Sequence, residues 1–195
     1  MRAQPPSTAS PTPLSDIRAT SRRRFLSRAA AASAVALLPA RALWARTLER
    51  RSLSFVHTHT GERLTSVYFE GGRYVPGELT RVNYLLRDFR TGDVHPIEPA
   101  VLDILADLRV LADREDAFEV ISGYRSPHTN AELHSHSSGV AEHSLHIKGR
   151  AIDVRLPGFP TARLRELALG MGRGGVGFYA SSDFVHLDNG RVRHW

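Results

Sequence analysis

Three residues in the second half of the chain carry side chains that commonly bind divalent metals. His146 and Asp153 belong to one short segment, Ser144–Asp153, and His186 follows later in the chain. Two imidazoles and one carboxylate form a ligand set for zinc, and three protein ligands leave one coordination position open for water. An open position is typical of catalytic rather than structural zinc. The residue types therefore predict a catalytic site with one zinc ion per chain.

The predicted strands around these residues explain how they could meet. Asp153 lies in an apolar strand expected over residues 151–156, where a carboxylate is costly unless it is paired or bound to a metal. His186 lies in a similar strand expected over residues 184–187, and Gly149 allows a tight reversal before the first strand. Each residue alone is better explained as a core histidine or a capping aspartate. The three together favour a metal site.

The periodicity of the rest of the chain predicts an α+β domain with a largely antiparallel central sheet flanked by helices. Strands are expected over residues 53–57, 64–70, 73–75, 118–121, 151–156, 176–179 and 184–187. Helices are expected over residues 79–89, 99–111 and 161–169. Residues 126–144 form a polar loop rich in serine and histidine, with one helical turn expected at residues 130–134.

The first 46 residues are predicted to be a twin-arginine signal peptide. Paired arginines and a Phe-Leu step in residues 21–27 precede a short apolar run, residues 29–40. This run falls short of the roughly 20 apolar residues that span a bilayer. We therefore expect a periplasmic or otherwise exported protein that uses the twin-arginine export machinery and keeps no stable membrane anchor after cleavage. A basic disordered tail is the alternative, and it explains the order of basic, apolar and small residues less well.

Charge and cysteine content exclude two classes of function. Eight of the 26 lysines and arginines but one of the 20 acidic residues lie in residues 1–46, so residues 47–195 carry 18 basic and 19 acidic side chains. The domain expected over residues 47–195 is thus nearly neutral, and no nucleic-acid partner is predicted. The chain has no cysteine, so neither a disulfide framework nor a thiolate nucleophile is available.

Several short motifs, taken together and in order, resemble a known family. The pattern around His146 and Asp153, followed by His186, resembles the zinc D-alanyl-D-alanine peptidases and the related lysostaphin and hedgehog folds. Within that superfamily the chain is most similar to exported murein endopeptidases of the K type. The motifs that carry the likeness are His59-Thr60-Gly61-Glu62, Leu86-Arg87-Asp88-Phe89-Arg90, Ser122-Gly123-Tyr124-Arg125-Ser126-Pro127, residues 140–146, residues 174–179 and residues 191–195.

The resemblance implies a zinc metallopeptidase domain over residues 47–195 and assigns roles to four residues. His146, Asp153 and His186 match the metal ligands. Arg125 matches an arginine that in relatives binds substrate and stabilises the negative charge of the tetrahedral intermediate. A surface arginine at the end of a strand is the alternative, and its position in a loop that carries other chemistry makes this explanation weaker.

The resemblance assigns the proton acceptor less firmly. Asp183 stands where relatives place an acidic general base, although a solvent-facing turn aspartate explains it nearly as well. Asp188 is expected either to support a metal ligand or to share the role of base. Ser144 has no nucleophile-elbow context, so we expect it to orient substrate or His146 rather than to attack.

The predicted function is hydrolysis of peptide cross-links in peptidoglycan by metal-activated water. The near alternative is D,D- or L,D-carboxypeptidase activity on the same peptides, because the ligand set does not decide which bond is cut. A non-catalytic, zinc-dependent cell-wall-binding module is an alternative of another class, and a base near the open coordination position would argue against it. A non-haem iron oxygenase shares the ligand types but fits the spacing less well. The pair His57 and His59 is expected to be structural or to line the rim of the site.

Overall fold

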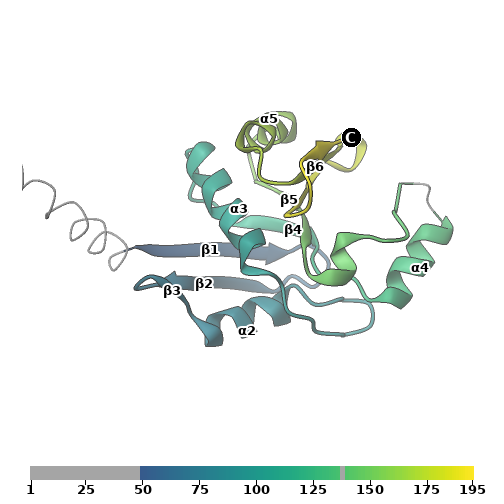
Figure 1. Ribbon diagram of the computed structural model, residues 1–195, viewed down its shortest axis with the longest axis horizontal. Helices are drawn as coiled ribbons and strands as arrows, with labels where there is room; N and C mark the ends of the chain where they lie inside the picture. Colours follow the sequence, from purple (N-terminus) through teal and green to yellow (C-terminus); the bar gives the residue numbers. More distant parts are fainter. Residues whose placement is uncertain (1–48, 137–138) are drawn as a thin grey trace, which may run out of the picture. The chain divides into compact units, whose positions relative to one another are not determined.

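The computed structural model describes residues 49–136 and 139–195, and all of them lie in one compact unit, residues 46–195 (Figure 1). The predicted signal peptide, residues 1–46, lies outside the described residues. The elements in chain order are β1 (Arg50–His57), β2 (Arg63–Glu70), β3 (Arg73–Tyr74), α2 (Pro76–Leu85), α3 (Pro99–Leu111), β4 (Phe118–Ser122), α4 (Pro127–His136), η1 (Leu145–Lys148), β5 (Ala151–Arg155), α5 (Thr161–Met171), β6 (Gly175–Tyr179), η2 (Ala180–Ser182), β7 (Phe184–Asp188) and β8 (Arg193–His194).

The strands form one eight-stranded sheet in the order β3-β2-β1-β4-β5-β7-β6-β8. Most neighbours are antiparallel, and the parallel pairs are β1 with β4 and β6 with β8. The α+β class and the largely antiparallel sheet predicted from the sequence are therefore confirmed. The three strands that matter most for the site, β5, β7 and β6, lie side by side in the half of the sheet that ends with the C-terminus.

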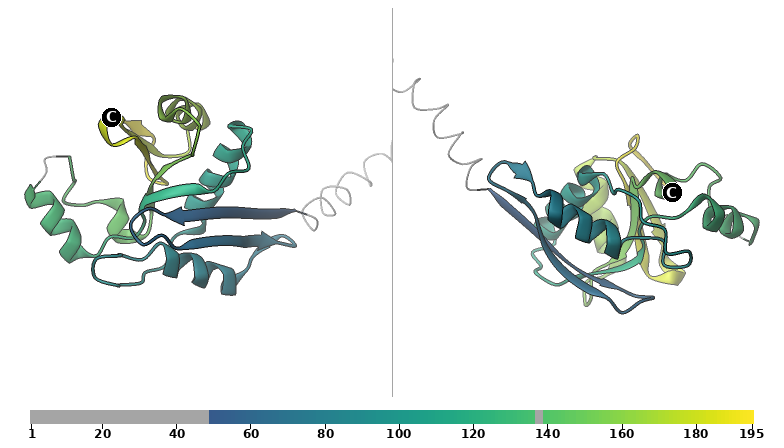
Figure 2. Two further views of the ribbon diagram at one scale, coloured as in Figure 1. Left: turned by 180° about the vertical axis from the view of Figure 1, so that it is seen from behind. Right: turned by 90° about the horizontal axis from the view of Figure 1, so that it is seen from below.

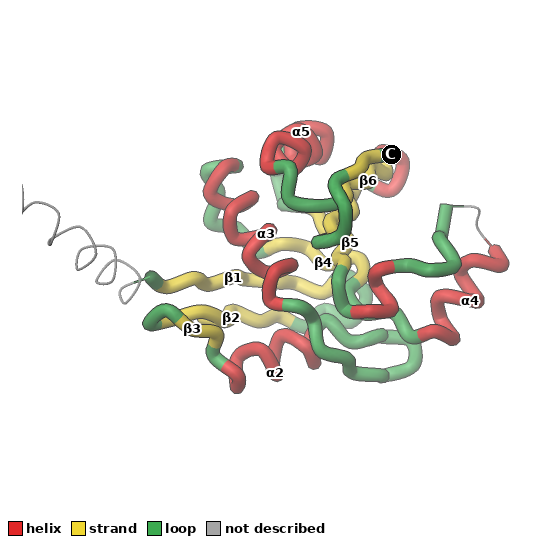
Figure 3. Tube along the Cα trace, viewed as in Figure 1, coloured by secondary structure: helices red, strands yellow, loops and turns green. Residues whose placement is uncertain are grey.

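Apolar side chains from the helices and the sheet form the core. Helix α3 buries Leu102, Leu105 and Leu108, three of the four leucines that its spacing places on one face, and contacts β1, β7 and α5. The fourth, Leu111, ends the helix and is 53% exposed. Helix α5 packs on β6 and β7, and α2 packs on β2 (Figure 3). Helix α4 contributes little to this core and projects away from the body of the domain (Figures 1 and 2). None of the helices in the described part of the chain is both long and apolar enough to span a membrane.

The first predicted helix ends earlier than expected. Its spacing predicted a helix to residue 89, whereas α2 ends at Leu85. The carbonyl of Leu86 accepts a hydrogen bond from the Tyr124 amide at 2.7 Å, and the Arg90 amide donates to Asp88 Oδ1 at 3.0 Å. These bonds replace the i to i+4 bond that would continue the helix. Leu86, the first residue after α2, is nevertheless fully buried in the core.

Two further differences concern short or polar segments. The expected single turn at residues 130–134 is a ten-residue helix, α4, which begins at Pro127, a residue well suited to the first turn. Strand β8 was not predicted, because two residues are too few to show an alternating pattern. Strand β8 borders the cavity described below, because Arg193 lines it, whereas no residue of α4 does.

Candidate metal centre

Two adjacent strands and one short helix bring the three predicted ligands together. Asp153 on β5 and His186 on β7 are directly opposite each other in the antiparallel pair. His146 lies on η1, whose first residues are capped by Ser144, because Ser144 Oγ accepts from the His146 amide at 3.3 Å. Gly149 ends η1 with a φ of 63°, and a Cβ there would come within 2.0 Å of a backbone carbonyl of the preceding loop. The reversal toward β5 therefore requires glycine.

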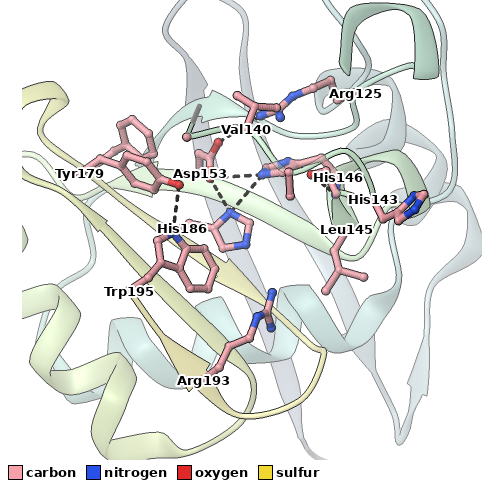
Figure 4. Close-up of a pocket in the computed structure, with 14 residues that line it drawn as sticks. Arg125, Val140, His143, Leu145, His146, Asp153, Tyr179, His186, Arg193 and Trp195 are labelled. Carbon is pink, nitrogen blue, oxygen red and sulfur yellow. Dashed lines mark hydrogen bonds and ion pairs between the residues drawn. The ribbon is translucent and has the colours of Figure 1, made fainter. Parts of the chain in front are cut away.

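The ligand atoms of these residues converge on one point (Figure 4). Asp153 Oδ1 lies 2.8 Å from His186 Nδ1 and 3.3 Å from His146 Nε2, and the two nitrogens are 3.1 Å apart. All three side chains are buried, with exposed fractions of 2 % for His146, 5 % for Asp153 and 7 % for His186. In the part of the chain that the structure describes, this is the one group of three or more such residues close enough to share a metal ion.

Hydrogen bonds to the outer nitrogens fix both imidazole tautomers. His146 Nδ1 lies 2.7 Å from the Gly123 carbonyl oxygen, which can only accept, so Nδ1 carries the proton and Nε2 keeps its lone pair. His186 Nε2 lies 3.0 Å from Asp188 Oδ2 and donates to it, so in the neutral ring Nδ1 keeps its lone pair. Such outer partners orient metal-binding histidines and strengthen them as ligands.

Asp188 is suited to this supporting role because it is held as a carboxylate. Burial works to raise its pKa, but hydrogen bonds from His186, from Arg193 and from the amides of Gly190 and Gly175 outweigh burial and hold the pKa well below its usual range. Arg193 is bidentate, with Nη2 at 2.7 Å from Oδ2 and Nη1 at 3.0 Å from Oδ1. Asp188 thus faces the outer side of the His186 ring, away from Asp153.

The charges at the centre call for a cation. Burial opposes protonation of His186, yet its hydrogen bonds to Asp153 and Asp188 raise its pKa to about 9. Burial lowers the pKa of His146 below its usual value. Burial also acts to raise the pKa of Asp153, but the two histidines hold it well below its usual range. Two neutral imidazoles would bring two lone pairs face to face beside a carboxylate, and either a proton or a metal ion between them relieves that repulsion.

The size of the triangle fits a divalent metal. Metal–ligand bonds of about 2.0–2.2 Å in tetrahedral geometry place ligand atoms about 3.3 Å apart. The three separations here, 2.8, 3.1 and 3.3 Å, are close to that value. One carboxylate and two imidazoles match the donor preference of zinc, and the same set also suits iron(II). The geometry therefore fits a metal ion without separating these two.

A cavity of about 360 Å³ opens beside the ligands. Its wall combines the ligands with the loop before η1, residues of β6 and β7, and the end of the chain. The residues that line it are Arg125, Gly139, Val140, Ala141, His143, Ser144, Leu145, His146, Asp153, Tyr179, Phe184, His186, Arg193 and Trp195. The cavity is large enough for a short peptide segment, and the three metal ligands form part of its wall.

Arg125 and Ser144, predicted to bind substrate, both line this cavity. Arg125 Nη2 lies 3.6 Å from Asp153 Oδ2, and Nη1 donates to Asn130 Oδ1 over a long distance of 3.4 Å. Its Nε is buried and has no partner among the described residues. Burial lowers the pKa of Arg125. The contacts of Nη1 and Nη2 are long, at 3.4–3.6 Å, so the guanidinium is well placed to bind an oxygen of a ligand in the cavity.

Asp183, predicted to be the general base, is not among the residues that line the cavity. It follows η2 with a φ of 51°, and this turn carries its side chain toward α5, where it accepts a short hydrogen bond from Thr161. Its other neighbour is Arg155, 4.0 Å away, and its side chain is 65 % exposed. The structure thus brings five predicted site residues to the cavity and places Asp183 elsewhere.

Tyr179 and Trp195 are among the cavity residues that received no role in the sequence analysis. Tyr179 ends β6, and Trp195 is the last residue of the chain. Their segments were part of the family resemblance, but neither spacing nor residue type indicated that they meet. Trp195 Nε1 donates to Tyr179 Oη at 3.0 Å. This contact depends on β8 pairing with β6, which the sequence did not reveal.

Known proteins resemble this chain over nearly all of the described part. Residues 45–195 match the family described as peptidoglycan L,D-endopeptidase MepK. The peptidoglycan L,D-endopeptidase MepK of Escherichia coli strain K12 is 39% identical over 175 residues, which cover 89% of this chain and 96% of that protein. The probable peptidoglycan L,D-endopeptidase MepK of Haemophilus influenzae is 39% identical over 176 residues, with 89% and 95% covered. No solved structure matches the chain significantly. The chain therefore belongs to the peptidoglycan L,D-endopeptidase MepK family.

Proposed function

We propose that this protein is an exported, zinc-dependent endopeptidase that cleaves L,D cross-links in peptidoglycan. The observation that carries the proposal is the convergence of His146, Asp153 and His186 at the floor of a cavity, in a chain that belongs to a peptidoglycan L,D-endopeptidase family. The relatives are endopeptidases by name, which favours cleavage between two stem peptides over removal of a terminal residue.

The proposed chemistry assigns one role to the metal ion and others to residues of the chain. A bound zinc ion would supply Lewis acidity and make water nucleophilic near neutral pH. His146 Nε2, His186 Nδ1 and an oxygen of Asp153 would hold it, and the outer hydrogen bonds to Gly123 and Asp188 keep both rings in the required tautomer. No serine or cysteine nucleophile is needed.

Arg125 is the proposed charge-stabilising residue. Its guanidinium lines the cavity beside Asp153, and its Nη groups make only long contacts of 3.4–3.6 Å, so it can bind the oxygen of the scissile amide as negative charge develops there. Ser144 is proposed to orient substrate as well as His146, since its oxygen caps η1 while its hydroxyl proton remains available. Removal of one such charge-stabilising donor typically lowers kcat about 100- to 1000-fold.

The general base remains a separate prediction. Asp183 keeps the assignment only because it lies three residues before His186, since its carboxylate is bound to Thr161 outside the cavity. Asp183→Asn tests the assignment. A fall in kcat of at least about 100-fold with unchanged metal content would support the role. Unchanged kcat would mean that another group of the cavity accepts the proton.

A zinc-dependent binding module without hydrolysis is the second candidate. One observation favours it, because neither Asp183 nor Asp188 lines the cavity next to the ligands. A carboxylate near the open coordination position was the feature expected to separate an enzyme from a binding module. Family membership favours the enzyme, and the assay below separates the two directly.

The proposed domain organisation is a twin-arginine signal peptide over residues 1–46 followed by the metallopeptidase domain over residues 47–195. The family match from residue 45 and the compact unit from Arg46 support the boundary. Peptidoglycan lies outside the cytoplasmic membrane, so its hydrolysis requires export. Replacement of Arg22 and Arg23 by lysine should leave uncleaved precursor in the cytoplasm if the signal is of this type. Unimpaired export of that variant would contradict it.

The function is tested by incubating the purified protein with muropeptide dimers and identifying the products by mass. We expect L,D-linked dimers to be split into monomers and D,D-linked dimers to remain, with activity lost on chelation and restored by zinc. His146→Ala and Asp153→Ala proteins that remain folded should be inactive. Release of a terminal residue from monomers would indicate a carboxypeptidase instead. Binding of dimers without cleavage would indicate the binding module.

A further inference from the structure

We propose that Tyr179 is a substrate-binding residue whose hydroxyl group donates to a negatively charged substrate oxygen, and that the terminal residue Trp195 orients it. This inference deepens the proposed function and rests on it. It concerns a pair of residues that no sequence pattern singled out, one at the end of β6 and one at the end of the chain. Both line the cavity that contains the metal ligands.

The end of the chain is fixed beside β6 by the backbone. The Phe178 amide donates to the Trp195 carbonyl at 3.1 Å, and the Trp195 amide donates to the Val176 carbonyl at 3.3 Å. The indole lies against Gly177, where a Cβ would approach the ring to 2.7 Å. Trp195 is thus held in one position by strand pairing and by a glycine that makes room for its ring.

The direction of the hydrogen bond between the two side chains determines where the Tyr179 proton goes. An indole N–H can only donate, so Trp195 Nε1 donates to Tyr179 Oη at 3.0 Å. The tyrosine oxygen is then the acceptor, and its own O–H must donate elsewhere. Within residues 49–136 and 139–195, the bond from Trp195 is the one hydrogen bond recorded for Tyr179 Oη. The hydroxyl is therefore a donor that remains available in the cavity.

The position of Tyr179 directs this donor toward the ligands. Its ring stacks on Phe184 with centroids 4.6 Å apart, which limits ring movement. Figure 4 shows its hydroxyl group on the side of Asp153 and His186, with Trp195 next to the His186 ring. The ring centroids of Trp195 and His186 are 5.2 Å apart. A substrate oxygen close to the ligands would thus come within reach of the hydroxyl.

The substrate offers two oxygens of suitable chemistry. The carbonyl oxygen of the scissile amide becomes negative during hydrolysis, and peptidoglycan stem peptides carry free carboxylates. Arg125 also lines the cavity and lies beside Asp153, with Nη2 at 3.6 Å from Oδ2. In Figure 4 Arg125 and Tyr179 lie on different sides of Asp153. The cavity thus has a charged donor and a neutral donor for the same type of oxygen atom.

Tyr179→Phe removes the hydroxyl and keeps the ring that stacks on Phe184. We expect kcat/KM for L,D-linked dimers to fall about 10- to 100-fold, with unchanged zinc content and unchanged Tm. A loss in kcat identifies the developing oxyanion as the acceptor, and a rise in KM identifies a carboxylate of the bound substrate. Tyr84→Phe is the matched control, because Tyr84 lies on α2 outside this cavity and is 56% exposed. An unchanged kcat/KM, or a loss of zinc, in Tyr179→Phe would overturn the inference.

Trp195→Phe tests the positioning role. It removes the indole N–H and keeps an aromatic ring, so Tyr179 loses only its orientation and we expect a smaller loss, about 3- to 10-fold. In a Tyr179→Phe background the same change should have almost no further effect on kcat/KM, because the hydroxyl that it orients is already absent. Additive effects of the two substitutions would refute the orienting role of Trp195.

A binding measurement separates failure of this inference from failure of the proposed function. The chain has two tryptophans, and Trp44 lies in the proposed signal peptide, so the fluorescence of the processed protein reports on Trp195 in the cavity. Titration with the uncross-linked stem peptide, which has a free carboxylate, needs no turnover. If the wild-type protein fails to cleave dimers, the proposed function fails. Weaker binding of the stem peptide by Tyr179→Phe would then still support the donor, and equal binding would overturn it.

Discussion

Two groups in this molecule each contain a buried histidine, yet the structure gives them different properties. One is the candidate metal centre formed by His146, Asp153 and His186. The other, which we call the His57 cluster, consists of His57 at the end of β1, the neighbouring exposed His59, and Phe89. In the His57 cluster, His57 is fully buried, and its ring contacts Phe89 edge-on with centroids 5.4 Å apart. His59 stacks on Phe89 at 4.2 Å.

The two groups differ in what surrounds the imidazoles. The centre has two carboxylates, Asp153 and Asp188, on opposite sides of His186, and they raise the pKa of His186 to about 9 despite burial. His57 has aromatic neighbours, and its Nε2 is buried without a partner among the described residues. Burial therefore lowers the pKa of His57. The comparison shows that the two buried carboxylates reverse the effect of burial on the pKa of His186, whereas burial prevails at His57.

The largest effect is expected from removing that carboxylate. Asp153→Asn keeps the shape of the side chain but leaves the two imidazoles without a negative partner. Metal affinity should fall by more than the 10- to 100-fold typical of losing an outer partner, and cleavage should become undetectable. Wild-type Tm should rise with added zinc because binding stabilises the folded state, whereas the Tm of the variant should not respond. A zinc-dependent rise in the variant would contradict the assignment.

A smaller loss is expected from Asp188→Asn. This change removes the charge that orients His186 from outside, while all three ligands remain. Metal affinity measured by competition with a chromogenic chelator should fall about 10- to 100-fold. Activity should return at high zinc concentration, which would distinguish a supporting residue from a general base. Activity that stays low in the fully zinc-loaded variant would instead assign Asp188 to proton transfer.

The sequence identified the centre because residue type carried the signal. A carboxylate in the apolar strand around Asp153 needs an explanation in any fold, and two histidines in adjacent elements supplied one. No such signal marked the pairing of Tyr179 with Trp195, because that contact depends on the two-residue strand β8. The position of Asp183 was likewise unpredictable, since a single turn with positive φ directs its side chain away from the cavity.

The fold likewise has some features that the sequence predicted and others that it did not. Strands and the face of α3 that is rich in leucine followed their periodicity closely. Helix α4 was underestimated because its sequence is polar and buries only Thr129 and Asn130. The end of α2 was misplaced because the carbonyl of Leu86 bonds to the amide of Tyr124, a partner from a distant loop. Local patterns predict elements, while tertiary hydrogen bonds decide where they end.

Asp88 adds a third case to the comparison between the metal centre and the His57 cluster, because it is a buried carboxylate without a histidine. It lies beside Phe89 of the His57 cluster, and its Oδ2 accepts from the Ser126 amide at 2.9 Å, next to Arg125. Burial works against its charge, but hydrogen bonds from Thr129 and from the amides of Ser126 and Arg90 lower its pKa from 3.8 to about 2.

Asp88→Asn should therefore lower the free energy of unfolding by about 1–2 kcal/mol at pH 7. The stabilisation by Asp88 is present above the unfolded pKa of 3.8 and is lost as the pH falls through about 2. The difference between variant and wild type should shrink over that range in urea titrations. Zinc content should not change, since Asp88 contacts no ligand. A difference that stays constant from pH 5 to pH 2 would contradict the assignment.

The smallest effect is expected from His57→Phe, which tests the cluster that lacks a carboxylate. Because the folded protein holds the pKa of His57 below the unfolded value of 6.5, its neutral form stabilises the fold fully above pH 6.5 and progressively less as the pH falls toward the lowered value. Phenylalanine does not titrate, so the variant does not lose stability in this way. Its free energy of unfolding relative to wild type should therefore increase as the pH falls from 7 to 5.5, by about 1 kcal/mol at most. Zinc binding should stay at one ion per chain, measured by metal analysis. A loss of zinc in this variant, or a relative stability that worsens on acidification, would show that the His57 cluster belongs with the metal centre rather than in contrast to it.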